Sequence, residues 1–526
     1  MNAIRLVSSA LTVGVWTLAS RVLGFARDVL IAAWLGTGPV AEAFLIAFAL
    51  PNMFRRFFAE GAFNMAFVPL FSKKLEAGDD AEAFARDAFS GLATVLIVFT
   101  ILATIFMPWL VYAMAAGFAG DERFDITVTL GRIVFPYILF ISLAALLSGV
   151  LNASGRFVAA AAAPVLLNIV LIAALLIAER LAPDFSVIDA AGAGGRHGTL
   201  LAFGFIVACI AHLSLVWIGV RRAGFDLRPK KPVWTPELKR LAIIAAPAAL
   251  AGGVVQVNLL IGRQVASFFD GAVAWLSYAD RLYQLPLGVV GIAIGIVLLP
   301  DLSRRLQAED MSGSQHALSR AAEMSMALAI PSAVALLVIP VTLVEALFQR
   351  GAFDADDTAA TAMACAVYGL GLPAFILQKV VQPLYFARED TKRPFYYAVV
   401  SMVVNAGVAI GLAPVIGFIA AAIATTLAGW VMLALLWIGT RNMGEAVRFD
   451  ARAKSRINRI VLASAIMGVA LWAAQFVAFR AIETPVLNLI SVLLLCVFGA
   501  VVYFVTGFAV GAFRRDEFRR AFRRQR

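Results

Sequence analysis

The amino-acid sequence predicts an all-α polytopic membrane protein with about 14 transmembrane helices. Three observations lead to this fold class. Of the 526 residues, 62% are hydrophobic and only 15% are charged, whereas soluble globular domains are about 45–50% apolar and about 25% charged. The mean hydropathy is +0.89. Apolar stretches long enough to cross a bilayer, which takes about 20 helical residues, recur along the whole chain.

The first apolar stretch, residues 7–35, is longer than the hydrophobic core of a cleavable signal peptide and contains charges, so we expect a first spanning helix. The second, residues 41–72, contains Pro51, which should kink it. The longest of the loops are 180–198 and 220–240. The remaining predicted spans are 88–115, 127–151, 159–179, 199–219, 241–268, 272–300, 321–346, 357–385, 394–414, 418–439, 459–479 and 487–512.

The distribution of Lys and Arg over the loops predicts the orientation of the chain. One set of alternating loops, together with both termini, carries 31 of these residues, and the opposite set carries five. Because loops rich in Lys and Arg stay in the cytoplasm, both termini should be cytoplasmic, which requires an even number of spans. The basic tail, residues 513–526, fits the same rule. A net charge of +11 therefore indicates orientation and not a nucleic-acid partner.

An internal repeat divides the chain. The sequence PLFSKKLEA at 69–77 resembles PDLSRRLQA at 300–308, and Pro136 and Asn168 align with Pro373 and Asn405. The offset of about 235 residues predicts two six-helix lobes that enter the membrane from the same side, as parallel repeats. The predicted parts are an N-terminal lobe at 1–222, a C-terminal lobe at 223–445, and two extra helices with the tail at 446–526.

Five arginines fall inside predicted spans: Arg21, Arg27, Arg55, Arg56 and Arg281. A charged side chain at the bilayer centre costs about 2.5–3.5 kcal/mol on the insertion scale. A lipid-facing position for all five would cost on the order of 12–17 kcal/mol, which is comparable to the whole stability of a domain. We therefore expect these arginines to line an internal, water-accessible cavity that binds an anion.

Other polar residues accompany the arginines. At 100° per residue, Arg21, Gly24 and Asp28 share one helix face. In the second span, polar residues recur every four positions, at Asn52, Arg56, Glu60 and Asn64. The span 272–300 places Asp280, Arg281 and Gln284 within two turns. Glu42 lies near the start of the second span.

A second interpretation of this polar set is that internal ion pairs brace the helices, because Asp28, Glu42, Glu60 and Asp280 accompany the arginines. The arginines outnumber these carboxylates only slightly, which leaves both interpretations open. Arginine, more than lysine, suits phosphate and carboxylate oxygens, because its planar fork donates two parallel hydrogen bonds.

The sequence contains no pattern typical of an enzyme or a metal site. There is no nucleophile elbow and no phosphate-binding glycine loop, and no carboxylate pair can be assigned acid and base roles. The three cysteines and three histidines are dispersed and match no metal-ligand spacing. We expect no cofactor, no metal and no catalytic residue.

The motifs that carry these polar residues resemble those of the MurJ (MviN) family. They are SRVLGFARD at 20–28, LPNMFRRFFAEGAF at 50–63, and YADR at 278–281 followed by Leu285-Pro286, together with FPYI at 135–138 and FVPL at 67–70. The resemblance covers essentially the whole chain, and the first two motifs are long enough to be specific.

The resemblance implies a flippase for lipid II, the undecaprenyl-pyrophosphate-linked peptidoglycan precursor, in the bacterial inner membrane. It implies a fold of two six-helix lobes plus a final helix pair that borders a groove for the lipid tail. It also implies that Arg21, Arg27, Arg55 and Arg281 line the headgroup cavity and that Asp28 and Glu60 are matching acidic positions. Glu42 stands where many members carry Asp, which changes the reach of the carboxylate.

Further expectations follow from the same resemblance. Transport would depend on the membrane potential, with a coupling ion that the sequence does not identify. Membrane lipids, and the machinery of cell-wall synthesis, would be partners. Two alternatives compete. One is a related exporter, either of another polyprenyl-linked saccharide or of drugs, although an exporter of cationic drugs should have an acidic cavity. The other is a membrane-embedded polyprenyl-dependent glycosyltransferase, which would need a catalytic carboxylate and usually a large external loop.

Overall fold

The computed structural model describes residues 3–55, 58, 62–181, 195–293, 301–302, 304–305, 308, 310–388, 390–444, 447–478 and 485–513. Within these ranges every regular element is helical, as the sequence predicts. Arg56, Glu60, most of the loop 180–198 and the tail beyond Phe513 lie outside the described residues. The chain divides into two compact units, Met1–Ala274 and Trp275–Arg526.

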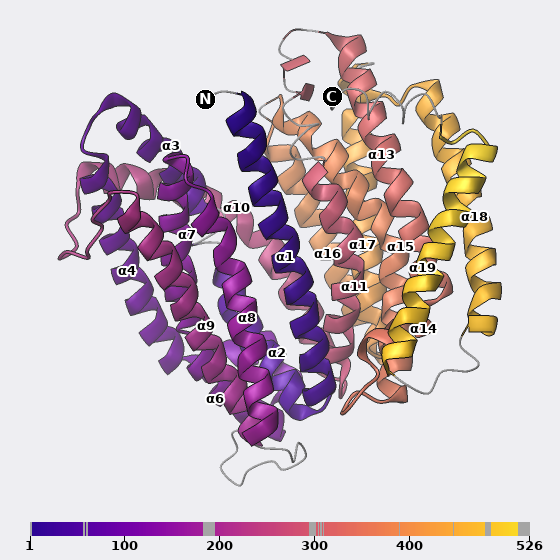
Figure 1. Cartoon of the computed structure of the whole chain (residues 1–526), viewed down its shortest axis with the longest axis horizontal. Helices are drawn as coiled ribbons and strands as arrows, with labels where there is room; N and C mark the ends of the chain where they lie inside the picture. The colour runs from indigo at the N-terminus through magenta and orange to yellow at the C-terminus, as the bar shows by residue number, and fades with distance from the viewer. Residues whose placement is uncertain are drawn as a thin grey trace. The chain divides into compact units, whose positions relative to one another are not determined.

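The first unit consists of ten α-helices and a short 3-10 helix over its described residues (Figure 1). They are α1 (Ala3–Leu35), α2 (Pro39–Arg55), α3 (Ala62–Ala77), α4 (Ala81–Ile105), α5 (Met107–Met114), η2 (Ala116–Phe118), α6 (Glu122–Val134), α7 (Tyr137–Ala153), α8 (Val158–Leu181), α9 (Gly195–Arg222) and α10 (Pro236–Ala266).

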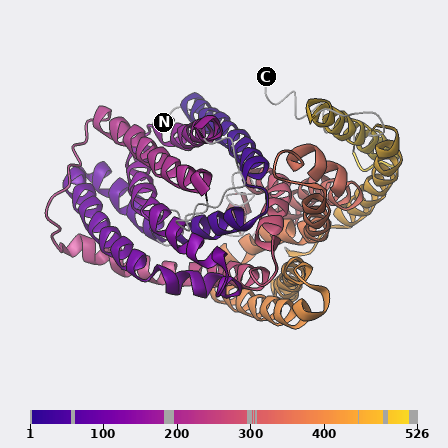
Figure 2. The same ribbon diagram turned by 90° about the horizontal axis from the view of Figure 1, so that it is seen from below.

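The second unit begins inside α11. Its described elements are α11 (Ala272–Ala293), α13 (Met311–Val338), α14 (Pro340–Phe348), α15 (Ala355–Phe386), α16 (Lys392–Ile416), α17 (Ile419–Gly439), η4 (Thr440–Asn442), α18 (Ala451–Ala478) and α19 (Pro485–Ala509). Helices α18 and α19 pack against each other, and α18 also packs against α13. Figure 2 shows the pair side by side in the second view as well.

Ten helical segments among the described residues are long and apolar enough to cross a membrane. They coincide with ten of the fourteen predicted spans, which confirms a multi-pass membrane protein. The four other predicted spans are 7–35, 41–72, 241–268 and 272–300, and their described parts are helical. These four include Arg21, Arg27, Arg55 and Arg281. The total of fourteen stays a prediction.

Several predicted spans are interrupted, and prolines explain where. The prediction 88–115 becomes α4 and α5, which separate at Phe106, two residues before Pro108. The prediction 321–346 becomes α13 and α14, which separate at Ile339, just before Pro340. A proline has no N–H to continue the helical hydrogen bonds, so it is best placed at the start of the next helix.

The two units repeat the same order of elements, in agreement with the sequence repeat. In each, a long helix (α4 or α13) leads through a short one (α5 or α14) to a loop and then to a further long segment (α6–α7 or α15). An aspartate caps the long helix in both cases, because Asp80 accepts the N–H of Ala83 and Asp310 accepts that of Gly313. The latter bond lowers the pKa of the Asp310 carboxyl.

Aromatic and aliphatic side chains form a core in each unit. In the first, Phe205 on α9 contacts the rings of Phe48 and Tyr137, with ring centroids 4.8 Å away in both cases. In the second, Met467 and Leu471 of α18 pack with Leu495 and Tyr503 of α19. The Tyr503 hydroxyl donates to the carbonyl of Ala327 at 2.7 Å, which fastens α19 to α13.

The predicted division into parts 1–222, 223–445 and 446–526 stays a prediction.

Candidate functional site

Arg27 on α1 lies in a compact polar cluster. Its Nε and Nη2 donate to Asp28 Oδ1 at 3.1 and 2.7 Å, and its Nη1 donates to Asn168 Oδ1 of α8 at 2.9 Å. Asn168 in turn donates to the backbone carbonyl of Ser20, at 3.1 Å. Because Asn168 is bound on both sides, α8 fixes the position of the guanidinium relative to α1.

This cluster leaves part of the Arg27 guanidinium available. Arginine has five N–H bonds, and those to Asp28 and Asn168 use one each on Nε, Nη1 and Nη2. The remaining N–H on each Nη has no partner among the described residues. Guanidinium N–H donors of this kind can bind the oxygens of a phosphate. The side chain of Arg27 is 13% exposed and that of Asp28 is 11% exposed.

Arg21 lies on the same helix and is exposed. Helical periodicity predicts that it shares one face with Asp28, and it makes no ion pair within the described part of the chain. Its guanidinium is therefore accessible to a ligand.

The second predicted span is divided between α2 and α3, and Arg55 is half-buried at the C-terminus of α2. Asn52, one turn earlier, donates to the carbonyl of Phe48 at 2.9 Å and accepts from the Tyr137 hydroxyl at 3.2 Å. Asn64, on α3, donates to the carbonyl of Ala145 on α7 at 3.4 Å. Asn52 and Asn64 thus attach α2 and α3 to α7. Arg56 and Glu60 fall outside the described residues.

The third predicted group belongs to the second unit. Arg281 and Asp280 are half-buried on α11. Gln284, one turn further along, is exposed and donates to the carboxylate of Asp280. The predicted clustering of Asp280 and Gln284 on this helix is therefore present.

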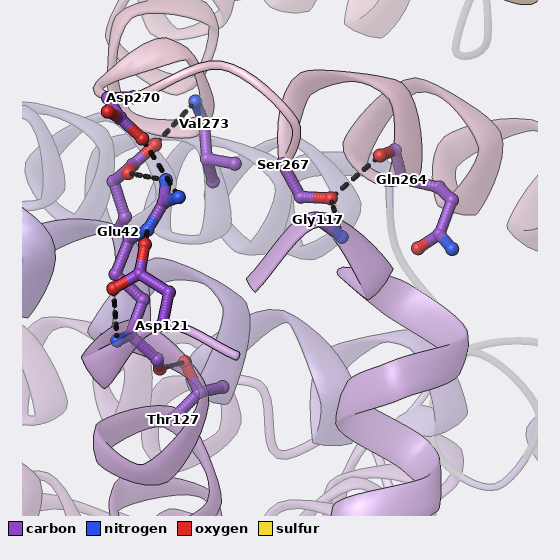
Figure 3. A network of polar contacts seen from close by, with 9 residues as sticks. Glu42, Gly117, Asp121, Thr127, Gln264, Ser267, Asp270 and Val273 are labelled. Carbon is purple, nitrogen blue, oxygen red and sulfur yellow. Dashed lines mark hydrogen bonds and ion pairs between the residues drawn. The ribbon is translucent and has the colours of Figure 1, made fainter. Parts of the chain in front are cut away.

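Glu42 lies in a different polar network, which Figure 3 shows from close by. Its side chain is 1% exposed. Glu42 Oε2 accepts from Arg123 Nη1 at 2.9 Å, and Oε1 accepts from the backbone N–H of Val273 at 3.0 Å. The sequence predicts Glu42 among the polar residues that accompany the arginines, whereas its partners in the structure are at the starts of α6 and α11.

Arg123 is the centre of this network, and sequence reasoning missed it. Besides Glu42, its guanidinium pairs with Asp121 Oδ2 at 2.6 Å and with Asp270 Oδ1 at 2.8 Å. It also lies over the ring of Phe118, 4.6 Å from the ring centroid. Three carboxylates surround one buried cation, so the charge of Arg123 is fully compensated. An available signal was Asp121-x-Arg123, an acidic helix cap followed by a basic residue at the head of an apolar span.

The turn between α10 and α11 is attached to η2 beside this network (Figure 3). The N–H of Ala116 donates to Gln264 Oε1, and the N–H of Gly117 donates to Ser267 Oγ, each at 3.0 Å. A Cβ on Gly117 would collide with the backbone of Ser267, so only glycine permits this approach. Residues 264–273, which we call the α10–α11 corner, are thereby fixed to the head of α6 and to α2.

The described residues contain no group of three or more His, Cys, Asp or Glu side chains that could hold a metal ion. Cys209 and Cys365 are buried and Cys496 is exposed, and all three are free thiols. The arrangement offers cationic and hydrogen-bonding groups to an anion.

Comparisons with known proteins agree with this chemistry. Residues 31–499 match the family model described as "Lipid II flippase MurJ". A "Probable lipid II flippase MurJ" of Rhizobium tropici is 42% identical over 523 residues, which is 97% of this chain and 96% of that protein. Its counterpart in Rhizobium meliloti (strain 1021) is 44% identical over 526 residues, covering 99% and 96%.

Solved structures show the same fold. A structure titled "Lipid II flippase MurJ, inward closed conformation" aligns with a TM-score of 0.76 at 25% identity, covering 94% of this chain and 98% of that one. An inward-facing multidrug resistance transporter of the MATE family aligns with a TM-score of 0.66 at 14% identity, over 81% and 95%. The latter similarity concerns the fold alone.

The Arg123 network makes a prediction about stability. Arg123→Ala leaves Glu42 buried without its cation, which costs about 3–5 kcal/mol. We expect this variant to unfold at a clearly lower temperature than the parent protein in detergent, whereas Arg304→Ala, which removes a 77% exposed side chain, should unfold with the parent. Equal unfolding temperatures for the two variants would show that the network is not stabilising. Adding Glu42→Gln to Arg123→Ala should restore part of the loss, because the unpaired charge is then removed.

Proposed function

The chain belongs to the MurJ family of lipid II flippases, and we propose that its arginine-lined helices bind the pyrophosphate of lipid II during transport. It is a multi-pass membrane transporter, not an enzyme, and its substrate is lipid II. The family match decides between the alternatives that the sequence left open, in favour of lipid II flipping and against another exporter or a glycosyltransferase. The observation that carries the proposal for the site is the partly available guanidinium of Arg27.

The headgroup of lipid II needs such a site because it cannot enter hydrocarbon alone. Its phosphates, sugars and peptide would lose their hydrogen bonds with water, at a cost of several kcal/mol for each unsatisfied group. Arg27 offers two N–H donors, and its partners Asp28 and Asn168 hold it in place. A guanidinium that is already oriented loses less conformational entropy on binding than a mobile one.

The other proposed headgroup residues are Arg21, Arg55 and Arg281. Arg21 is exposed, and Arg55 and Arg281 are half-buried, so each keeps part of its surface accessible. Asp28, Asn52, Asp280 and Gln284 are the proposed supporting residues, since each is hydrogen-bonded within its own unit. For Arg56 and Glu60 the proposal rests on the sequence motif.

Alternating access by the two sequence repeats is the proposed mechanism, with 1–222 and 223–445 as the lobes and 446–526 bordering the path of the lipid tail. Glu42 takes a separate role in this scheme. With Arg123 it holds the α10–α11 corner against α2 and α6 within the first unit, at the end of the helices that the loop charges place outside the cell.

The remaining parts of the proposal concern the cell. The membrane is the bacterial inner membrane, with both termini in the cytoplasm. The membrane potential drives transport, since moving a charge across 100 mV is worth about 2.3 kcal/mol, and no coupling ion is assigned. The enzymes of cell-wall synthesis that make and use lipid II are the proposed partners besides membrane lipids.

Depletion of the protein tests the function directly. Lipid II should accumulate in the inner leaflet, wall synthesis should stop and the cells should lyse. Accessibility of lipid II to an externally added enzyme measures its leaflet. Normal exposure of lipid II on the outer leaflet, in cells without another flippase, would contradict the function.

Substitution of the arginines tests the site. Arg27→Ala and Arg281→Ala should abolish complementation of a depleted strain while protein levels stay normal, because the anion loses its donors. Lysine at either position should restore growth only partly, since an ammonium gives a point charge in place of a planar fork. Arg304→Ala, with an exposed guanidinium, is the matched control and should complement fully. Full complementation by the alanine variants at positions 27 and 281 would contradict the binding site and favour the interpretation that these arginines only brace the helices.

Single cysteines in a background without Cys209, Cys365 and Cys496 test the orientation. A cysteine at Lys231, exposed in the loop between α9 and α10, should react with an impermeant reagent only after the membrane is opened. A cysteine at Ala119, exposed between η2 and α6, should react in intact cells. The reverse pattern would overturn the proposed topology. Ala190, in the longest predicted external loop, is outside the described residues and serves as a further position.

A further inference from the structure

The segment that joins the two sequence repeats, residues 223–235 between α9 and α10, is packed onto α3 and α4 within the first unit. The backbone N–H of Lys230 donates to Ser90 Oγ of α4 at 3.0 Å, and Ser90 is 3% exposed. Leu227 is buried, and Phe225 contacts Phe71 of α3 with 5.9 Å between ring centroids. The linker therefore has a defined path across α3 and α4.

The end of the linker is equally well defined. Thr235 caps α10 by accepting the N–H of Leu238 at 3.2 Å, and Pro236 begins the helix. Leu238 is buried and lies directly against Gly91 of α4. The side chains between these two anchor points are thus presented outward from a fixed backbone.

Those outward side chains combine positive charge with a large aromatic ring. Trp234 is 68% exposed and Val233 is 60% exposed. Arg228, Lys230 and Lys231 beside them are exposed as well. We call these five residues the linker surface. A tryptophan this open to water is unfavourable for a packed protein, whereas the headgroup layer of a membrane suits its apolar ring and its N–H.

The charge of this region is strongly one-sided. Residues 221–240 contain seven Lys and Arg but only two acidic residues, Asp226 and Glu237. Both acidic side chains are already paired, Asp226 with Arg228 at 3.3 Å and Glu237 with Lys74 at 3.9 Å. The region therefore complements a negatively charged partner.

The start of α10 shows which kind of partner fits. The helix begins with the exposed Lys239 and Arg240, and one turn later Ile243 and Ile244 are exposed, by 63% and 45%. The sequence predicts that α10 spans the membrane from about residue 241, so these isoleucines should contact hydrocarbon and the polar–apolar boundary should lie within one turn of the linker. That position places Trp234 and the three basic side chains at the level of the phosphates.

We propose that the linker surface binds anionic phospholipid headgroups, with Trp234 inserted at the membrane interface and Arg228, Lys230 and Lys231 against the phosphates. This binding goes beyond substrate transport, because none of these residues belongs to the proposed headgroup site for lipid II. It holds the segment that connects the repeats, and the first turns of α10, at the membrane surface. The proposed orientation assigns this surface to the inner leaflet.

An environment-sensitive fluorophore on a cysteine at position 234 tests the proposal, in the full-length protein without its native cysteines. In nanodiscs that contain phosphatidylglycerol, its emission should shift to the blue relative to nanodiscs of phosphatidylcholine alone. High salt should reduce the difference, because it screens charges near the surface. The difference should be lost in the triple variant Arg228→Gln, Lys230→Gln, Lys231→Gln.

The matched control is a cysteine at Trp109 on α5. Trp109 is 72% exposed, and residues 105–117 contain no Lys or Arg. Its label should respond to a bilayer but equally to both lipids. Quenching of the native tryptophans by brominated phosphatidylglycerol, stronger in the parent protein than in Trp234→Phe, repeats the test with all native cysteines in place.

Equal emission at position 234 in the two lipids, or a lipid difference that survives in the triple variant, would overturn the proposal. A shift produced in detergent by glycerol phosphate alone would also overturn it, because the site would then bind a soluble anion. Nanodiscs expose both faces to the same lipid, so the result does not depend on the orientation. Retained lipid II flipping by the triple variant would separate this surface from the transport site.

Discussion

A charged side chain inside a membrane protein needs polar partners or water around it, because hydrocarbon offers neither. The structure meets this constraint in two different ways. Arg123 forms ion pairs with three carboxylates, Glu42, Asp121 and Asp270. Its charge is therefore fully compensated within the protein. Arg27 has one carboxylate and one amide partner, and part of its guanidinium stays available. The first arrangement suits a structural contact and the second suits a binding site.

This difference separates the bracing contact of Arg123 from the proposed binding site at Arg27. Glu42 and Arg123 brace the first unit at the α10–α11 corner, where Gly117 allows the backbones to approach. Arg27 is also held by neighbouring side chains, Asp28 and Asn168, but these bonds use only some of its N–H donors. An arginine that is held by a neighbour and keeps two donors is oriented before its ligand arrives, so bracing and binding are compatible at that residue.

The two repeats use different chemistry for the contact between corresponding helices. In the first unit, the head of α6 contacts α2 through the buried ion pair of Arg123 and Glu42. In the second, the head of α15 contacts α11 through a neutral donor, since Trp275 Nε1 donates to Asp357 at 2.8 Å. Asp357 also completes a capping box with Asp354. The repeat thus preserves the helix order and the capping aspartate, while the interhelical contact diverges.

The helical membrane fold, the main spans and the family could be predicted from the sequence, because hydropathy and motif are local properties of the chain. The cationic helices could be located in the same way, since an arginine in an apolar stretch is visible without coordinates. Which charges meet could not be predicted, because it depends on how the helices pack. Arg27 donates a hydrogen bond to Asn168, 141 residues further along the chain, and Arg123 donates one to Glu42, 81 residues earlier. Helical periodicity reports the face on which a side chain lies, and the partner opposite that face depends on how the helices pack.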